Sequence, residues 1–294
     1  MLQLQRVLAT TDLSAPARHA AERGALVAKD AGATLHVVHV ISDPVLGSLR
    51  RLLEGSPDDV EFRLRGKIES DVARLGEHLA QTLGAPVPAG VVTGPLIAGI
   101  LGHAAANRAD LLVLGARGAS FMRHLMLGST AERLVRKSAL PLLVVKQPPH
   151  ERYRRVLVAV DFSPLSLAAL DLARAVAPHA DLILLHSYEV PYEDWMQTVE
   201  VREDALQHYR QAARQCALQG MQAFLEAAGL TATGVPTVVV KGDPTLRILE
   251  QEQELDCDLI VIGKQGGTAP EEFLLGSVTK HVLQQSQSDV LVVV

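Results

Sequence analysis

The sequence contains an internal duplication, and this feature limits the possible folds more than any other. The segment RVLATTDLSAPARHAAERGALVA, which begins at Arg6, resembles RVLVAVDFSPLSLAALDLARAVA, which begins at Arg155. A second pair follows in the same order, ADLLVLGARG from Ala109 and CDLIVIGKQG from Cys257. Each copy then ends in an apolar run, PLLVVK in the first half and DVLVVV in the second. Self-similarity over such a distance indicates that one folding unit occurs twice.

The length of the chain agrees with two domains. Single hydrophobic cores stop growing at roughly 250 to 300 residues, and most domains have about 100 to 150, whereas this chain has 294. We therefore predict one domain over residues 1–147 and a second over residues 151–294. The segment QPPHERYRR from Gln147 combines a proline pair with charged residues, which predicts a short linker across the surface.

Short apolar runs alternate with segments of helical periodicity in the first half. The apolar runs predict strands at Val7–Thr10, Thr34–Val40, Ala89–Val92, Leu111–Leu114 and Leu142–Val145. The periodic segments predict helices at Ala15–Ala31, around Val60–Leu83, at Pro95–Arg108 and from Ser129. Five strands that alternate with four helices predict an α/β fold, with a doubly wound parallel five-stranded sheet in each half. Ligands bind to such sheets beyond the carboxyl ends of the strands.

Both halves carry the same glycine spacing directly after the fourth predicted strand. GARGASFMRHLMLGST begins at Gly115, and GKQGGTAPEEFLLGSV begins at Gly263. In each segment a glycine is followed by two residues, a second glycine, nine residues, a third glycine and a serine. Because the spacing occurs at the same place in both repeats, it indicates a shared site.

The residue types in this spacing suit a phosphate group. Gly115 and Gly118 permit a tight turn and the close approach of a ligand to the backbone. Gly128 precedes the next predicted helix, whose first amides are free donors at the positive end of the helix dipole. The hydroxyls of Ser129 and Thr130 can add further donors. The alternative is that Ser129 only caps its helix.

The second half offers nearly the same groups, namely Gly263, Gly266, Gly276, Ser277, Val278 and Thr279. Ser277 has the same alternative role as a helix cap. The repetition of the full spacing favours phosphate binding over simple capping in both halves.

A carboxylate follows the first predicted strand of each half, at Asp12 in TTDLSAP and at Asp161 in AVDFSPL. Such a group can accept hydrogen bonds from the exocyclic amine or the ribose hydroxyl of a nucleotide. The alternative is local turn chemistry, because an Asp followed by Ser and Pro commonly starts a helix. The expected position of Asp12 at the same sheet edge as Gly115 favours a ligand role.

Both halves resemble the universal stress protein family, specifically its ATP-binding branch. The residues that carry the resemblance are Gly115, Gly118, Gly128, Ser129, Gly263, Gly266, Gly276 and Ser277, together with Asp12 and Asp161. The resemblance covers residues 3–146 and 152–294, so the chain resembles a tandem universal stress protein.

The resemblance implies a flavodoxin-like or Rossmann-like fold with an adenine-nucleotide site in each half. Adenine would lie near the strand-end Asp and the backbone after the second strand, which corresponds to Val40 in the first half and Ser187 in the second. The phosphates would lie against the glycine loop and the serine. The implied ligand is ATP, ADP or AMP, either alone or with Mg²⁺.

Family members commonly dimerise, so the resemblance implies an intramolecular pseudo-dimer or a homodimer. We expect the halves to pair through their apolar final strands, Leu142–Val145 and Leu291–Val294, because exposed strand edges are liabilities unless they are paired or covered.

The favoured function is a regulatory stress-response protein, in which a bound nucleotide biases the shape of the protein or the binding of an unidentified protein partner. One alternative is a slow ATPase or phosphoryl-transfer enzyme on the same pocket, and another is a domain that binds a non-nucleotide ligand. Phosphoryl transfer needs a positioned base near the γ-phosphate. The only repeated carboxylates at this edge, Asp12 and Asp161, are expected at the adenosine end. No catalytic residue is therefore predicted.

Other functions receive little support from the sequence. There is no Walker A sequence and no Gly-x-Gly-x-x-Gly after a strand. The net charge of -5 and the aromatic fraction of 3% argue against nucleic-acid binding. His36 and His39 lie three residues apart on a predicted strand and so face opposite sides, which argues against a shared metal ion. The two cysteines, Cys216 and Cys257, are too few for a disulfide framework.

The sequence also predicts no membrane association. No apolar stretch approaches the 18 or more residues that a membrane span needs. The N-terminus becomes polar within a few residues, so we expect a cytoplasmic protein.

The two glycine segments differ in charge, which predicts unequal sites. Arg117 and Arg123 lie in the first segment, where they would form a cationic clamp for a triphosphate. Glu271 and Glu272 occupy the equivalent part of the second segment, where Lys264 would offset only part of their repulsion. We therefore expect the first half to bind ATP more tightly, unless both glutamates point into solvent or pair elsewhere.

Overall fold

The computed structural model describes residues 3–43, 57–118, 127–199, 201–230, 234–266 and 275–294. The first half contains β1 (Arg6–Thr10), α1 (Ala15–Ala31), β2 (Thr34–Ser42), α3 (Pro57–Leu83), β3 (Ala89–Gly94), α4 (Leu96–Ala106), β4 (Leu111–Gly115), α5 (Ser129–Lys137) and β5 (Leu142–Val145). Each predicted strand and helix of this half is present.

The second half repeats this order. It contains β6 (Arg155–Ala159), α6 (Pro164–Val176), β7 (Asp181–Tyr188), α7 (Glu193–Thr198), α8 (Glu203–Ala227), β8 (Thr237–Lys241), α9 (Pro244–Glu254), β9 (Leu259–Gly263), α10 (Ser277–Gln285) and β10 (Asp289–Val293). The short helix α7 lies between β7 and α8.

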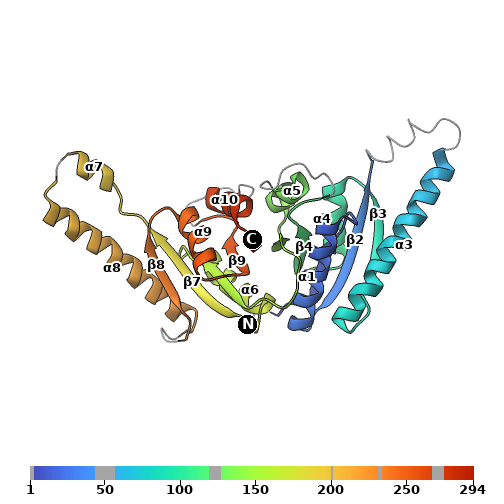
Figure 1. The fold of residues 1–294 in the computed structure, drawn as a ribbon, viewed down its shortest axis with the longest axis horizontal. Coiled ribbons are helices and arrows are strands. Elements are labelled where there is room, and N and C mark those ends of the chain that lie inside the picture. The colour runs from blue at the N-terminus through green and yellow to red at the C-terminus, as the bar shows by residue number, and fades with distance from the viewer. Residues whose placement is uncertain (1–2, 44–56, 119–126, 200, 231–233, 267–274) are drawn as a thin grey trace.

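The strands form one ten-stranded sheet in the order β3-β2-β1-β4-β5-β10-β9-β6-β7-β8. Pairing is parallel inside each half, as for β1 with β4 and for β6 with β9. At the centre, β5 and β10 pair antiparallel, with Leu143 opposite Leu291. The predicted doubly wound α/β fold and the predicted pairing of the final strands are both confirmed. The two five-stranded sheets thereby join into a single continuous sheet (Figure 1).

Helices cover both faces of this sheet, which explains why the strands are apolar almost throughout. Side chains of α1, α3, α6 and α8 pack in one core cluster, and those of α4, α5, α9 and α10 pack in another. Each cluster includes residues of both halves. In Figure 1, α3 and α8 lie at the two ends of the molecule, whereas α5 and α10 lie near its middle.

Local signals explain the agreement between predicted and observed bounds for α1. The Ser14 side chain accepts a hydrogen bond from the backbone amide of Ala17 and so caps the helix, and Pro16 lies in its first turn. The helix ends at Gly32, which has φ of 67°, a left-handed conformation that glycine adopts without steric cost.

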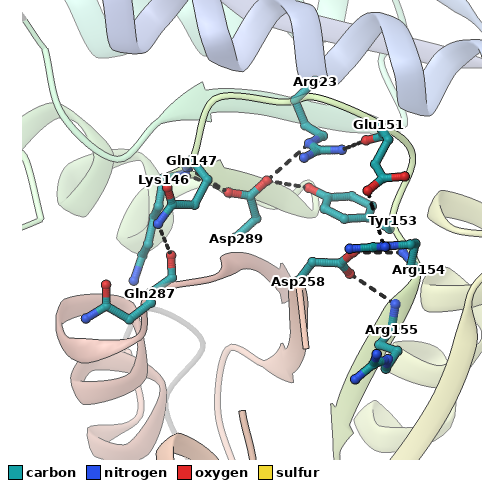
Figure 2. Close-up of polar contacts among 10 residues, drawn as sticks. All are labelled: Arg23, Lys146, Gln147, Glu151, Tyr153, Arg154, Arg155, Asp258, Gln287 and Asp289. Atoms are coloured by element: carbon teal, nitrogen blue, oxygen red, sulfur yellow. Dashed lines mark hydrogen bonds and ion pairs between the residues drawn. The ribbon is translucent and has the colours of Figure 1, made fainter. Parts of the chain in front are cut away.

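The linker between the halves is partly buried, so the predicted surface course is wrong at Tyr153, which is only 3% exposed. Its hydroxyl donates to Asp289 Oδ2 over 2.7 Å, and Arg23 forms an ion pair with the same oxygen at 3.3 Å (Figure 2). The Arg23 guanidinium also lies 4.2 Å from the centroid of the Tyr153 ring. These three residues come from α1, the linker and β10, and they fix the linker between the halves.

Burial changes the acid–base properties of this corner. It raises the pKa of the Tyr153 hydroxyl well above its ordinary value, and the nearby Asp289 carboxylate raises it further. Burial also raises the pKa of Asp289, against the opposing effect of Arg23. The sequence motifs contained no sign of this cluster, because its members come together only when the two halves pair.

No helix in the described ranges combines the length and the apolar character needed to cross a membrane.

Cys257 is buried, whereas Cys216 is exposed on α8.

Candidate functional site

The two glycine loops leave the sheet at the carboxyl ends of β4 and β9, where Gly115 and Gly263 are the last strand residues. Each loop returns to its own start. The Gly128 amide donates to the Ala116 carbonyl over 2.8 Å, and the Gly276 amide donates to the Lys264 carbonyl over 2.9 Å. The repeated spacing therefore brings the third glycine of each half beside the residue that follows the first.

These returns are tight enough to restrict the third position of the spacing. A Cβ atom on Gly128 would lie 3.2 Å from the Ala116 carbonyl oxygen, and one on Gly276 would lie 3.3 Å from the Lys264 carbonyl oxygen. A larger residue at either position would have to displace the loop backbone.

The helices α5 and α10 start at these third glycines. Gly128 and Gly276 are the N-cap residues, and neither helix has a side-chain hydrogen bond at its cap. Ser129 and Ser277 are the first helical residues and do not act as caps, so the capping alternative is wrong for both serines. The first amides of both helices therefore have no side-chain acceptor at the N-cap. They lie at the positive end of the helix dipole.

The strand-end carboxylates lie against the second glycine of each loop. Asp12 Oδ2 is 2.7 Å from the position that a Cβ atom on Gly118 would take, and Asp161 Oδ2 is 3.3 Å from the same position on Gly266. The structure therefore brings each Asp and its glycine loop together. A side chain at Gly118 would collide with the carboxylate, which explains the need for glycine there.

The other carboxylate oxygen takes part in local turn chemistry. Asp12 Oδ1 accepts from the Ser14 amide over 3.0 Å, and Asp161 Oδ1 accepts from the Ser163 amide over 3.1 Å. In the second half, Asp161 Oδ1 also accepts from the hydroxyls of Ser163 and Ser166, each over 2.6 Å. The turn interpretation is therefore confirmed for Oδ1 and coexists with the position of Oδ2 at the loop.

The second half contains a cavity of about 370 Å³ at this edge of the sheet. Its walls include all the candidate residues of that half, namely Asp161, Ser187, Gly263, Gly266, Gly276, Ser277 and Val278. The other lining residues come from the ends of β6, β7 and β9, from the loop and from α6, α9 and α10, and they include the apolar Val160, Leu185, Ile248 and Ile262 and the polar Ser163, Ser166, His186, Gln265 and Thr279. An apolar pocket with a few converging polar groups is typical of a small-molecule site.

The second strand of each half continues past the residue expected to follow it. β2 continues to Ser42, so Val40 lies inside the strand, opposite Val92 of β3, and not after it. The Val40 side chain is buried and packs against α4 at Gly99. The equivalent Ser187 in β7 faces the cavity, and its hydroxyl donates to the Gly242 carbonyl over 2.5 Å.

In each half a histidine on the second strand contacts the backbone carbonyl directly before the strand-end Asp. His39 Nδ1 lies 2.9 Å from the Thr11 carbonyl oxygen, and His186 Nδ1 lies 2.8 Å from the Val160 carbonyl oxygen. Burial lowers the pKa of both imidazoles. Since Thr11 and Val160 directly precede the Asp residues, these contacts hold the backbone that positions the carboxylates. His39 and His186 occupy equivalent positions in the sequence repeat.

Two groups predicted to face a ligand are engaged elsewhere. The Thr279 hydroxyl donates to the Gly263 carbonyl over 2.7 Å, so it braces the loop. Lys264 is 4% exposed, and its ammonium group donates to the carbonyls of Arg136 and Ser138 in the other half over 3.0 and 3.2 Å. Because the Lys264 ammonium group contacts carbonyls of the other half, the structure does not support the prediction that Lys264 would partly offset the repulsion from Glu271 and Glu272.

Two of the residues predicted to contact phosphates in the first half, Arg117 and Thr130, lie in the described part of the chain. Arg117 is half-buried, and it lies near enough to Lys146 to contribute to lowering the pKa of that lysine. Thr130 is half-buried in the first turn of α5. Arg123, Glu271 and Glu272 lie outside the described residues. Among the residues that the structure describes, no group of three or more His, Cys, Asp or Glu side chains is arranged to hold a metal ion.

The comparison with protein families identifies the relatives of this fold. The model of the universal stress protein family matches residues 3–146 and again residues 152–294. The chain belongs to the universal stress protein family. It is a tandem member, with one family domain in each half, as the sequence repeat indicated.

Individual relatives agree with this assignment. The chain is 31% identical over 146 residues to the universal stress protein YxiE of Bacillus subtilis, a match that covers 48% of this chain and 99% of that protein. It is 29% identical over 215 residues to the universal stress protein Rv1996 of Mycobacterium tuberculosis, which covers 68% of this chain and 65% of the relative. The match thus spans about two thirds of the longer mycobacterial protein.

A solved structure extends the likeness to the whole fold. The crystal structure of a universal stress protein from Archaeoglobus fulgidus matches with a TM-score of 0.70 and 22% identity, covering 99% of this chain and 98% of that one. At this identity the match establishes the fold, with both halves included.

Proposed function

We propose that this universal stress protein binds adenine nucleotides, ATP above all, and acts in the cytoplasm as a regulatory module of the stress response. The observation that carries the proposal is the convergence, in both halves, of a strand-end Asp, a closed glycine loop and a helix start without a side-chain cap. Each group has a complementary part in a nucleotide.

The phosphates would lie at the start of α5 in the first half and of α10 in the second. The amides that follow Gly128 and Gly276 offer donors at the positive helix end, and the hydroxyls of Ser129 and Ser277 stand beside them. A helix start of this kind binds anions because the backbone supplies both hydrogen bonds and partial positive charge. Arg117, and Arg123 beyond the described residues, would add charge in the first half only.

The adenosine part would lie toward Asp12 or Asp161, with Val40 and Ser187 at the wall of the pocket. In the second half the wall behind this position is apolar, which suits a base, while Asp161 and Ser187 offer polar contacts. The volume of about 370 Å³ lies in the range of roughly 300 to 1,000 Å³ that is typical of small-molecule pockets. Any Mg²⁺ would enter with the phosphates, whose oxygens supply most of its ligands in nucleotide sites.

A binding module is favoured over an ATPase by the position of the carboxylates. Asp12 and Asp161 contact the second glycine of each loop and are tied into the turn after the first strand. These positions suit adenosine, whereas a catalytic base must reach the γ-phosphate. Bound nucleotide would then act by biasing an interaction with a protein partner, either in the single chain or in a homodimer.

Mass spectrometry of the small molecule released by denaturing the purified protein tests this proposal first. We expect ATP, ADP or AMP in an amount approaching one or two per chain. Incubation with ATP and Mg²⁺ should then release negligible phosphate. Multiple turnovers that Asp12→Ala or Asp161→Ala abolishes would favour the enzyme, and a released molecule without adenine would favour a different ligand class.

A further inference from the structure

Two lysines cross between the halves and reach the ends of the two candidate phosphate helices. Lys264 comes from the second half, and its ammonium group donates to the Arg136 and Ser138 carbonyls at the C-terminal end of α5. Lys146 comes from the first half, and its ammonium group donates to the Ser286 carbonyl over 2.8 Å and to the Ser286 hydroxyl over 2.6 Å. Ser286 is the C-cap residue of α10.

Both contacts are favourable for the same physical reason. The last carbonyls of a helix lack hydrogen-bond donors inside the helix and lie at the negative end of its dipole. An ammonium group there donates to these carbonyls and is attracted by the dipole. Lys264 is nearly fully buried, and burial lowers its pKa. Burial likewise lowers the pKa of Lys146 to about 8, with Arg117 contributing and with Glu252 and Asp289 opposing the shift. Each buried ammonium group therefore depends strongly on the carbonyls that it contacts.

Each lysine is also connected to the glycine loop of its own half. Lys264 directly follows the first loop glycine, and its carbonyl accepts the hydrogen bond from Gly276 that closes the second loop. Lys146 directly follows Val145, whose carbonyl accepts from the Ala116 amide of the first loop over 2.7 Å. Figure 2 shows Lys146 and Gln147 at this junction, beside Asp289 of the other half.

These contacts form two short connections between the candidate sites. One runs from the second loop through Lys264 to the end of α5, which starts at the first phosphate position. The other runs from the first loop through Lys146 to the end of α10, which starts at the second. Each helix has nine residues and therefore spans only about 13 Å. A movement of one loop would shift the helix that serves the opposite site.

The lysines are not part of the sequence repeat. Lys264 aligns with Ala116, and Lys146 aligns with the C-terminal residue Val294. The pairing of β5 with β10 includes neither lysine, so the lysine contacts are a further connection between the halves.

We propose that Lys264 and Lys146 are positioning residues that couple the two nucleotide sites, so that occupancy of one site changes the affinity of the other. This inference rests on the proposed function, since it assumes a nucleotide at the start of α5 and α10. Coupling of this kind is reciprocal and typically changes affinity by about 5-fold to 150-fold.

Isothermal titration with ATP and Mg²⁺ measures the coupling. The affinity of the second site is determined with the first site disabled by Gly128→Asp, and again from the second binding step of the unaltered chain, in which the tighter first site is already filled. We expect these affinities to differ by about fivefold or more. In Lys264→Met or Lys146→Met, which keep the aliphatic length and remove the donor, the difference should fall to within about twofold. Lys137→Met is the matched control, because Lys137 lies exposed in the last turn of α5, and it should leave the difference unchanged.

A second readout separates coupling from loss of stability. In the Gly128→Asp protein, where only the second site can fill, adding ATP should shift the amide resonances of Arg136 and Ser138, and Lys264→Met should remove those shifts. Equal second-site affinities with the first site empty or filled, or lysine variants that lower only the melting temperature while the affinity ratio persists, would overturn the coupling. Absence of ATP binding in every variant and in the unaltered chain would instead contradict the proposed function.

Discussion

The two halves share a backbone cradle but differ in the side chains around it. In both, the third glycine closes the loop, the second glycine lies against the strand-end Asp, and a histidine holds the carbonyl before that Asp. The Asp161 carboxylate accepts from Ser166, whereas the equivalent residue in the first half is Ala17. The loop residue Arg117 of the first half corresponds to the neutral Gln265. The duplication has preserved the geometry of the cradle and altered the charge around it.

The same contrast exists where the halves meet. The buried residues Arg23, Tyr153 and Asp289 form a polar corner on one side of the paired strands. Their repeat equivalents are Leu172, Leu4 and Pro141, of which both leucines are buried. One corner therefore depends on charges and hydrogen bonds, and the other depends on apolar packing, although both occupy equivalent places in the fold.

The largest effect is expected from breaking the polar corner. Asp289→Asn leaves Arg23 buried without its carboxylate, which costs about 3 to 5 kcal/mol of unfolding free energy when a buried pair is broken. Urea denaturation measures the loss. Asp258→Asn is the control, since the Asp258 carboxylate accepts only backbone amides of Arg154 and Arg155 in a partly exposed position (Figure 2). Equal losses in the two variants would show that the corner is no more important than a surface turn.

The next effect concerns the sites themselves. Gly128→Asp places a carboxylate at the start of α5, where like charge and bulk should weaken ATP binding to the first site on the order of 100-fold at low salt. Gly128→Ala adds the Cβ without the charge and should cost much less. Gly276→Asp should leave the tighter first site intact. Equal residual affinity in the two Asp variants, or tighter binding in the second half, would contradict the predicted asymmetry.

A smaller effect is expected from pH, through Lys146. Its pKa is about 8 in the folded protein and near 10.5 when unfolded. Between these values the unfolded chain binds more protons, so stability should rise by about 1.5 kcal/mol from pH 8 to pH 9.5. The raised pKa of Tyr153 opposes the gain only above about pH 10. Denaturant titrations at several pH values should show this rise, and Lys146→Met should remove it; a rise that persists in the variant would assign it to another group.

The smallest effect is expected at Tyr153. Tyr153→Phe removes one buried hydrogen bond to Asp289 but keeps the ring against Arg23, so it should cost about 1 to 2 kcal/mol in unfolding free energy. Leu4→Ala at the equivalent apolar corner removes packing instead and should cost about 2 to 5 kcal/mol. A loss at Tyr153 that matches or exceeds the loss at Leu4 would mean that the hydroxyl contributes more than a single hydrogen bond.

The sequence alone predicted the parts of the molecule that depend on local pattern. The strand and helix positions follow from apolar runs and helical periodicity, and the positions of the glycine loops follow from the repeated spacing that begins at Gly115 and Gly263. The spacing could not indicate the direction of Lys264, because its partners belong to the other half. For the same reason, the linker residue Tyr153 was assigned to the surface.

The sequence and the structure agree on which groups meet at the carboxyl ends of the strands. Asp12 lies against Gly118 and Asp161 lies against Gly266, at the sheet edge expected from the sequence, and their role in binding a ligand stays a prediction. The predicted clamp at Arg123 and the opposing Glu271 and Glu272 lie outside the described residues, so the asymmetry remains a prediction from charge and sequence position.

Titration of the unaltered protein with ATP and Mg²⁺, after removal of any bound small molecule, tests the central claim most directly. The duplicated cradle predicts saturable binding that approaches two ATP per chain, in two steps of unequal affinity, with GTP binding more weakly than ATP. No measurable heat of binding with ATP, ADP or AMP, together with melting temperatures that none of these nucleotides changes, would contradict the claim that the repeated glycine loops hold an adenine nucleotide.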